Sequence, residues 1–416
     1  MLKSKVRSVR RYDPLSLVNW RCTDPECGMR FGAIADKNGK VSCPNCGNEN
    51  NPRSVFEVLT EQREKIVSEK KVPEKVPVVL SGIRPTGELH LGNYFGAIMF
   101  FVKLQEQNNE CLYFVADLHA LTTAMEDHID VDATSIDVVR WYLACGVDPD
   151  KALIYRQSDI FEIPFFSLLL GMITPEGELR RCTTYKDKVQ DMEGKRKLIS
   201  LGLLSYPVLM AADILFCNAD IVPVGEDQLQ HLEIAREIAR RYNYYFAEKH
   251  TIVEPQPHML EAIRVPGLKG EGKMSKSVGG PDNVIFLSDS PKEIRRKVMA
   301  AQTDTGPVEG ASMSEAMQNI YMLLKLCAPS DVYDEYLERY NKGEQKFYGY
   351  LKKDLAQNIV DLLEPIQARY NSNECSPERV KQLLRENAER VRPIAKRNLR
   401  NMLSDMNFKH LAHNYQ

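Results

Sequence analysis

The stretch VVLSGIRPTGELHLGN (residues 78–93) decides the fold class. Its apolar start predicts a buried strand, and a turn with glycine and proline then leads into a helix that opens near Asn93. In an open α/β sheet, ligands bind beyond the carboxyl ends of the strands, where helix N-termini offer N–H groups to phosphates. Gly92 would let a nucleotide approach the backbone, and His90 and Asn93 would direct polar groups at its phosphates. The alternative is a tight turn that carries a surface histidine.

Strand-like and helix-like segments alternate after this stretch. The strand-like segments are residues 78–83, 111–116, 152–157 and 220–224. The segments with helical spacing are residues 93–107, 132–145, 161–173, 205–217 and 227–242. This alternation predicts an α/β fold with a Rossmann-type, doubly wound parallel sheet.

We expect the chain to consist of four parts. Residues 1–55 hold clustered cysteines in a small metal-binding module, and residues 56–77 form a linker helix and a charged tether. Residues 78–290 form the Rossmann domain. Residues 291–416 form a C-terminal helical domain, because no strand signal follows Pro291. In that part Ser376 is a suitable helix cap, and Pro377 suits the first helical position.

The composition excludes several classes of protein. With 43% hydrophobic and 27% charged residues, the 416-residue chain is typical of a globular protein. No apolar run reaches the roughly 20 residues of a membrane span. The basic first residues lack the apolar segment of a signal peptide, so we expect a cytoplasmic protein, with a mitochondrial address as the alternative. Most of the other cysteines are scattered, which suits a reducing compartment.

A second segment that carries candidate functional side chains is GKMSKSVGG (residues 272–280). Lys273 and Lys276, with two serines, can surround a polyphosphate with cations and hydroxyl donors. Glycines on both sides would let such a loop close and reopen. The alternative is a solvated basic loop.

A third segment places a carboxylate among apolar residues. Tyr206, Met210 and Asp213 are spaced i, i+4 and i+7, so they share one helix face. One interpretation is an amphipathic helix with Asp213 at the boundary to solvent. The other is a flat apolar slot with a single acceptor, which is what an indole with one N–H donor requires.

Together the segments resemble a known family. HLGN (90–93) followed by KMSKS (273–277) resembles the two signatures of class I aminoacyl-tRNA synthetases, with Asn93 where a histidine is usual. MAADIL (210–215) and VPVGEDQ (222–228) are similar to the tryptophan-specific branch of that family. The resemblance spans residues from about 78 to 405.

The resemblance implies ATP-dependent activation of L-tryptophan to an adenylate, with Mg²⁺, and transfer of the acyl group to tRNA(Trp). It implies these catalytic residues: His90, Asn93, Lys188, Lys273 and Lys276. It implies these ATP contacts: Arg84, Pro85, Thr86, Gly92, Asn93, Gly225, Glu226, Asp227, Val265, Lys273, Met274, Ser275, Lys276 and Ser277. It implies these tryptophan contacts: His119, Tyr206, Met210, Asp213, Val222, Val224 and Gln228. The chain departs from the family at Leu80, where a related form has phenylalanine, and at Arg84, where glutamine is frequent. For Lys188, a charge on a solvated helix is the alternative.

The family resemblance also implies a symmetric homodimer and anticodon recognition by the C-terminal helices. Residues 376–416 carry nine lysines and arginines against four acidic residues. Such a basic end could follow an RNA backbone. A solvated amphipathic helix is the alternative.

The N-terminal cysteines predict a metal site outside the family core. Cys22, Cys27, Cys43 and Cys46 form two pairs with turn-forming neighbours, a spacing that fits tetrahedral Zn²⁺ in a structural, ribbon-like site. A rubredoxin-like iron or an iron–sulfur cluster are alternatives for the metal. Contact with tRNA, together with the basic first residues, is an alternative role.

Three other functions compete with this interpretation. A tyrosyl-tRNA synthetase would share the fold and chemistry, but MAADIL and GEDQ argue against it. A catalytically silent relative that senses tryptophan or RNA, and a zinc-ribbon RNA-binding protein, are both disfavoured by the intact HLGN and KMSKS segments.

Overall fold

The computed structural model describes two compact units, Met1–Lys75 and Val76–Gln416. In the first unit it describes four short strands and Lys75, and in the second residues 76–194, 198–247, 250–259, 263, 265–270, 272, 274, 280–306 and 312–415. The strands of the first unit are β1 (Val18–Arg21), β2 (Arg30–Ala33), β3 (Val41–Ser42) and β4 (Glu49–Asn50). They form two antiparallel pairs, β1 with β2 and β3 with β4.

The second unit is built on a five-stranded parallel sheet with the order β7-β6-β5-β8-β9. Its strands are β5 (Val78–Ile83), β6 (Glu110–Val115), β7 (Ala152–Arg156), β8 (Ile221–Val224) and β9 (Gln256–Met259). The chain winds outward from β5 first to one side and then to the other, so the order of strands reverses between β5 and β8. The predicted α/β fold with a parallel sheet is therefore confirmed, and β9 is a strand that we did not predict.

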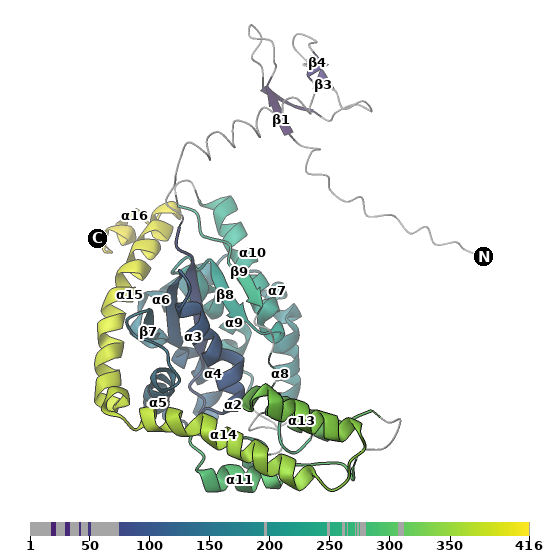
Figure 1. Cartoon of the computed structure of the whole chain (residues 1–416). Coiled ribbons are helices and arrows are strands. Elements are labelled where there is room, and N and C mark those ends of the chain that lie inside the picture. Colours follow the sequence, from purple (N-terminus) through teal and green to yellow (C-terminus); the bar gives the residue numbers. More distant parts are fainter. Residues whose placement is uncertain are drawn as a thin grey trace, which may run out of the picture. The chain divides into compact units, whose positions relative to one another are not determined.

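Helices cover both faces of this sheet (Figure 1). Between β5 and β6 lie α2 (Leu91–Asn93), the π-helical turn η2 (Tyr94–Ile98) and α3 (Met99–Gln105). Between β6 and β7 lie α4 (Asp117–Asp127) and α5 (Val131–Ala144). Between β7 and β8 lie η3 (Gln157–Asp159), α6 (Glu162–Gly171), α7 (Glu176–Arg181), α8 (Thr183–Gly194) and α9 (Leu201–Leu215). After β8 come η4 (Glu226–Gln228) and α10 (Leu229–Tyr245).

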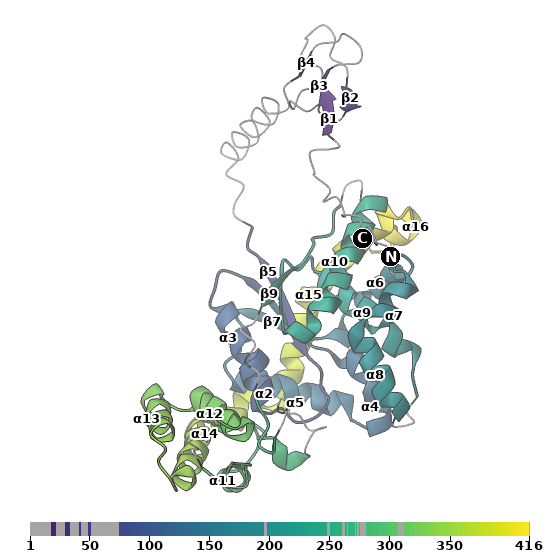
Figure 2. The same ribbon diagram turned by 90° about the vertical axis from the view of Figure 1, so that its right-hand side faces the viewer.

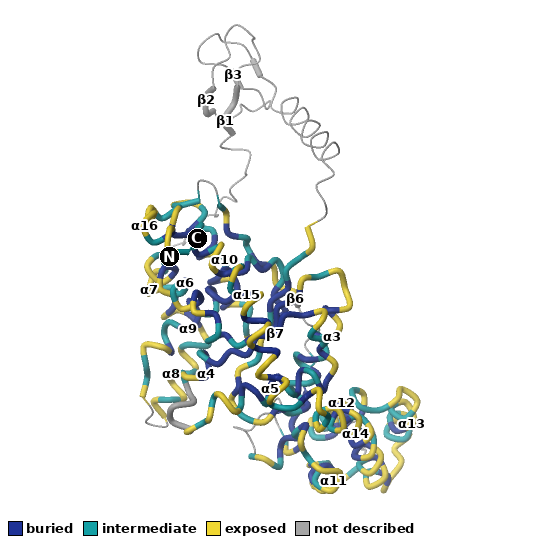
Figure 3. The backbone as a smooth tube through the Cα atoms, turned by 90° about the vertical axis from the view of Figure 1, so that its left-hand side faces the viewer, coloured by how far each residue is buried: buried dark blue, intermediate teal, exposed yellow. Residues whose placement is uncertain are grey.

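Alternation along the strands builds two apolar layers, because successive side chains of a strand point to opposite faces. Val79, Tyr113 and Ile154 pack into one buried cluster with α3 and α5. Leu80 and Phe114, their neighbours along the chain, pack into another with α6, α9 and α10. The strands at the centre of the unit are correspondingly buried (Figure 3).

The chain after Pro291 is helical, as predicted. Its helices are α11 (Pro291–Met299), α12 (Glu315–Cys327), α13 (Ser330–Asn341), α14 (Tyr348–Tyr370), α15 (Pro377–Asp405) and α16 (Lys409–His413). Helices α11 to α14 gather at one end of the unit (Figure 2). Helix α15 begins where the sequence predicts, with the Ser376 hydroxyl accepting from the Arg379 N–H. It returns to the sheet, where the Asn387 amide donates to the Ile154 carbonyl at 3.1 Å.

The turn between α14 and α15 is fixed to α5. The Arg140 guanidinium donates to the Cys375 carbonyl at 2.8 Å and to the Tyr370 hydroxyl at 2.6 Å. The Tyr370 ring stacks on Trp141 with 4.0 Å between ring centroids. These contacts join the C-terminal helices to the helical layer of the sheet. Among the described helices, none is long and apolar enough to cross a membrane.

Candidate active site

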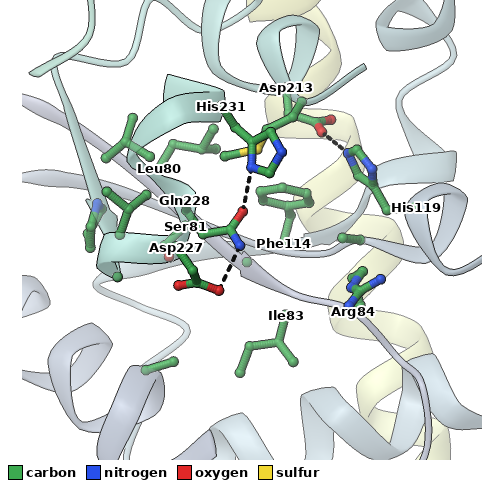
Figure 4. Close-up of a pocket in the computed structure, with 18 of the residues that line it drawn as sticks. Leu80, Ser81, Ile83, Arg84, Phe114, His119, Asp213, Asp227, Gln228 and His231 are labelled. Atoms are coloured by element: carbon green, nitrogen blue, oxygen red, sulfur yellow. Dashed lines mark hydrogen bonds and ion pairs between the residues drawn. The ribbon is translucent and has the colours of Figure 1, made fainter. Parts of the chain in front are cut away.

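A cavity of about 540 Å³ opens at the carboxyl end of the sheet, beside the reversal of strand order between β5 and β8. This is where open α/β sheets bind their ligands. Thirteen predicted site residues line it: Arg84, Gly92, Asn93, His119, Lys188, Tyr206, Met210, Asp213, Val222, Val224, Gly225, Asp227 and Gln228. Segments more than a hundred residues apart in the sequence thus meet around one space (Figure 4).

Asp213 is the buried carboxylate of the cavity, with 1% of the residue exposed. Its Oδ2 lies 2.8 Å from His119 Nε2, and both of its oxygens accept from the Gln157 amide, at 2.7 and 2.9 Å. Burial raises the pKa of Asp213, and the hydrogen bonds from His119 and Gln157 oppose that rise. The predicted acceptor is therefore present, held by two donors on other elements.

Gln157 is a site residue that we did not predict. It follows β7 directly and is fully buried. Its Nε2 donates to Asp213, and its Oε1 accepts from the backbone N–H groups of Leu118 and His119 at the start of α4. One side chain therefore fixes the carboxylate relative to α4. The sequence signal was a polar amide, after Arg156, at the end of a strand-like run that begins with apolar residues.

A second polar chain runs through His231, another residue that we did not predict. The Tyr206 hydroxyl lies 2.5 Å from His231 Nε2, and His231 Nδ1 lies 3.0 Å from the Gln228 amide oxygen. The Gln228 amide in turn donates to Asp227 at 3.1 Å (Figure 4). His231 stands three residues after Gln228, so the two residues lie on the same side of a helix. This spacing is the sequence signal that could have indicated His231 as a site residue.

Two cations lie at the cavity wall. Burial lowers the pKa of Lys188, and the neighbouring Arg84 guanidinium lowers it further. The Lys188 ammonium lies 4.4 Å from the centre of the Tyr206 ring. Within the described part of the chain no carboxylate forms an ion pair with Lys188 within 4.0 Å. Adjacent like charges without a carboxylate favour an anionic ligand.

The HLGN turn is shaped by its own hydrogen bonds. His90 Nδ1 accepts from the Gly92 N–H at 3.1 Å, and the Asn93 Oδ1 accepts from the His90 N–H at 3.1 Å. The His90 side chain thus caps α2 and is not among the residues that line the cavity, whereas Gly92 and Asn93 are. A Cβ atom on Gly92 would lie 2.8 Å from the His90 ring, so glycine is required for this turn.

The segment around Met274 lies beside this turn. A Cβ on Gly92 would stand 3.7 Å from the Met274 carbonyl, and Leu91 N donates to the Ile285 carbonyl at 3.0 Å. Met274 is buried, and its N–H donates to the carbonyl of Val265, also buried, at 2.7 Å. The structure therefore places Met274, the described residue of the second signature, beside the first signature.

The structure describes some of the remaining predicted residues and not others. Pro85 and Thr86 follow Arg84 but do not line the cavity. Outside the described residues lie Lys273, Ser275, Lys276, Ser277, Cys22, Cys27, Cys43, Cys46 and the side chain of Glu226. Their predicted roles stay predictions.

Comparison with known proteins gives the family. A family model described as tRNA synthetases class I (W and Y) matches residues 71–391. The chain is 43% identical over 325 residues to the tryptophan–tRNA ligase of Porphyromonas gingivalis, covering 77% of this chain and 96% of that protein. Among solved structures, it is similar to the tryptophanyl-tRNA synthetase of Campylobacter jejuni complexed with ADP and tryptophan, with a TM-score of 0.68 and 34% identity over 79% of this chain and 99% of that one. The synthetase of Mycoplasma pneumoniae gives a TM-score of 0.69 and 32% identity over 81% and 99%.

The chain therefore belongs to the class I tRNA synthetases for tryptophan and tyrosine. Within that family, it has tryptophan–tRNA ligase activity, as the HLGN, KMSKS and MAADIL segments predict.

Proposed function

We propose that the cavity holds L-tryptophan with its indole against Asp213 and ATP against the HLGN turn, and that it forms tryptophanyl-adenylate there before transfer to tRNA(Trp). The observation that carries this proposal is the buried Asp213 carboxylate, which lines the cavity beside several apolar side chains. Met210, Val222 and Val224 supply apolar walls. An indole ring has one N–H donor and no acceptor, which matches this arrangement.

Two features support the proposed ATP-binding region of the cavity: glycines without side chains and nearby positive charge. Gly92, Asn93 and Gly225 line the same region of the cavity, and Lys188 and Arg84 supply cations. Pro85, Thr86, Glu226, Asp227 and Val265 are proposed to complete this side. The C. jejuni structure, whose ligands are ADP and tryptophan, provides a relative with both kinds of ligand.

The proposed reaction needs no covalent enzyme intermediate. A tryptophan carboxylate oxygen attacks the α-phosphorus of ATP in line, a new P–O bond forms, and the bond to pyrophosphate breaks. Negative charge grows on the leaving group, so catalysis consists of positioning and electrostatic stabilisation. Lys273, Lys276 and Lys188 are proposed to stabilise that charge, and His90 and Asn93 to hold the turn on the nucleotide side.

Mg²⁺ fits this site as a companion of the triphosphate. The described residues contain no group of three or more histidine, cysteine or acidic side chains that could hold a metal ion. Magnesium at nucleotide sites is bound mainly by phosphate oxygens and water, with one or two carboxylates. Asp227, exposed at the cavity, is the described carboxylate that could contribute. When bound, the ion would neutralise phosphate charge.

The direct test of the proposed function is amino-acid-dependent ATP–pyrophosphate exchange, followed by aminoacylation of tRNA(Trp). We expect exchange with tryptophan and at least about 10⁴-fold lower kcat/KM with tyrosine or phenylalanine, because a site built around a specific hydrogen bond rejects side chains that cannot make it. Comparable exchange with tyrosine would assign the pocket to the other branch of the family.

The C-terminal helices are proposed to contact the tRNA anticodon. Helix α15 buries one face against the sheet and exposes Lys381, Arg385, Arg390, Lys396 and Arg397. A row of exposed basic residues on one helix is an electrostatic footprint for nucleic acid. A homodimer is also proposed, and its support is the exposed apolar set of Phe161, Leu168, Met172, Leu198 and Leu201.

We further propose that the first unit holds one structural Zn²⁺ through Cys22, Cys27, Cys43 and Cys46. The support is their sequence position: the first pair lies between β1 and β2, and the second lies between β3 and β4. Two paired-strand units that each carry two cysteines in the connection are typical of a zinc ribbon. The four thiolates would bind the ion tetrahedrally.

We expect Cys43→Ser to lose that metal. The purified chain should contain about one zinc per chain by elemental analysis, and the variant about none, since three thiolates hold zinc far more weakly. Cys327→Ser, which changes a half-buried cysteine of α12, is the matched control and should keep its metal. Pyrophosphate exchange should survive in Cys43→Ser. A metal-free wild-type chain would contradict the site, and loss of exchange would show that the module is not separable.

A further inference from the structure

His231 connects three residues that line the cavity, although it belongs to neither signature segment. It lies in the first turn of α10 with 2% of the residue exposed. Its ring contacts Tyr206 of α9, Gln228 of η4 and Thr184 of α8. A histidine that joins three elements at a cavity wall can control how their polar groups are oriented.

The hydrogen bonds fix where the protons are. The Gln228 oxygen is an acceptor only, so His231 Nδ1, 3.0 Å away, carries the hydrogen. In a neutral ring Nε2 is then an acceptor with one lone pair, and the Tyr206 hydroxyl at 2.5 Å lies closer to it than the Thr184 hydroxyl at 2.9 Å, so we assign the donated hydrogen to Tyr206. The Tyr206 oxygen, having given its proton to this bond, has only lone pairs to offer to the cavity that it lines.

We propose that His231 is a positioning residue that makes Tyr206 an obligatory acceptor, so that the cavity selects a substrate carrying a protonated primary amine. This inference rests on the proposed binding of tryptophan in the cavity. An ammonium group has three donors and no acceptor, and it needs oxygen atoms whose protons point elsewhere. Asp227, which also lines the cavity and accepts from Gln228, adds negative charge on the same side.

The ring has to be neutral for this role, and its surroundings keep it so. Burial and the charge of Lys188 together lower the pKa of His231 to about 4, while Asp227 opposes the shift. His119 contributes to the lowering of this pKa as well. The ring is therefore uncharged over the neutral pH range. A protonated ring could not accept from Tyr206, and it would repel an incoming ammonium group.

The test compares tryptophan with indole-3-propionate, which keeps the indole and carboxylate but lacks the amine. We expect His231→Leu to weaken tryptophan binding by about 10- to 100-fold while changing the affinity for indole-3-propionate by less than about threefold. The preference for the amine should therefore shrink by about 10-fold or more. Binding is measured by calorimetry or by competition in pyrophosphate exchange.

Two further variants separate positioning from packing. His231→Gln can place an acceptor near the position of Nε2 and should restore most of the preference, whereas His231→Asn, which reaches only to the position of Nδ1, should not. In a double-mutant cycle, Tyr206→Phe should remove most of the effect of His231→Leu or His231→Asn, because the two residues act through one hydrogen bond. His410→Leu, at an exposed histidine of α16, is the control and should leave both affinities unchanged.

Equal loss of affinity for both ligands would overturn the proposal and leave His231 as a packing residue. Additive effects of Tyr206→Phe and the His231 variants would overturn it as well. If His231→Leu does not fold, the contrast between His231→Gln and His231→Asn decides. Failure of the proposed function is distinguishable, because the wild-type chain would then show no tryptophan binding that depends on Asp213.

Discussion

Asp213→Ala is expected to lower kcat/KM for tryptophan by about 10³-fold or more, with little change in the KM for ATP. Two effects add. The substrate N–H loses its acceptor, and the donors of His119 and Gln157, now 2.7–2.9 Å from the Asp213 carboxylate, are left unpaired beside an apolar wall. Buried donors without partners cost about 1–3 kcal/mol each. Pyrophosphate exchange at varied tryptophan and ATP concentrations measures both constants.

The matched control for this variant is Asp187→Ala, an exposed carboxylate on α8, which should change neither constant by more than about twofold. A benzothiophene analogue of tryptophan, which replaces the N–H by sulfur, gives the second comparison. Wild type should have a much higher kcat/KM for tryptophan than for this analogue, and Asp213→Ala should reduce the ratio of the two values. If the variant kept the full preference for tryptophan over the analogue, Asp213 would have only a structural role in α9. Another group would then recognise the indole N–H.

Lys276→Ala is expected to lower the rate of adenylate formation by about 10²-fold or more, while tryptophan binding stays within a few-fold of wild type. The reason is that its charge would act on the pyrophosphate only as the bond to the α-phosphorus breaks. An interaction made in the transition state appears in kcat and kcat/KM together. The described residue of this segment, Met274, has its carbonyl next to Gly92.

Single-turnover formation of the adenylate, with tryptophan affinity measured separately, distinguishes a catalytic from a binding defect. Lys292→Ala removes an exposed lysine of α11 and should behave like wild type. Lys276→Arg keeps the charge but changes its geometry, so an intermediate rate is expected. Near-normal exchange by Lys276→Ala would contradict the role assigned to the KMSKS segment.

The sequence predicts the inner strands well because burial on both faces produces continuous apolar runs. Strand β9 was missed because it is not buried on both faces. Its residues Gln256, Pro257 and His258 are exposed, and it pairs only with β8 at the edge of the sheet. Proline is tolerated at such an edge, so the segment carried no strand signal. Helix α4 was missed because it follows β6 after a single residue, without a glycine or proline to mark a turn between them.

For the cavity, the sequence predicts residues inside recognisable segments and misses the residues that hold them. Asp213 and Tyr206 were found because they share one helix face. Gln157 was not found, because it reaches Asp213 across 56 residues of sequence. No local pattern records a contact between a strand end and a distant helix. The supporting hydrogen bonds of a site are a property of the tertiary fold, and they have to be observed in the structure.

The hydrogen bonds of Arg140 to Cys375 and Tyr370 limit where the C-terminal helices can bend. They fix the last turn of α14 to α5, and the Gln367 amide adds a bond to the Leu287 carbonyl at 2.7 Å. Just before these anchors, Pro365 stands inside α14 and cannot donate a hydrogen bond to the preceding turn. Bending of α14 relative to this anchored end is therefore easiest at Pro365, where the helix lacks one backbone hydrogen bond.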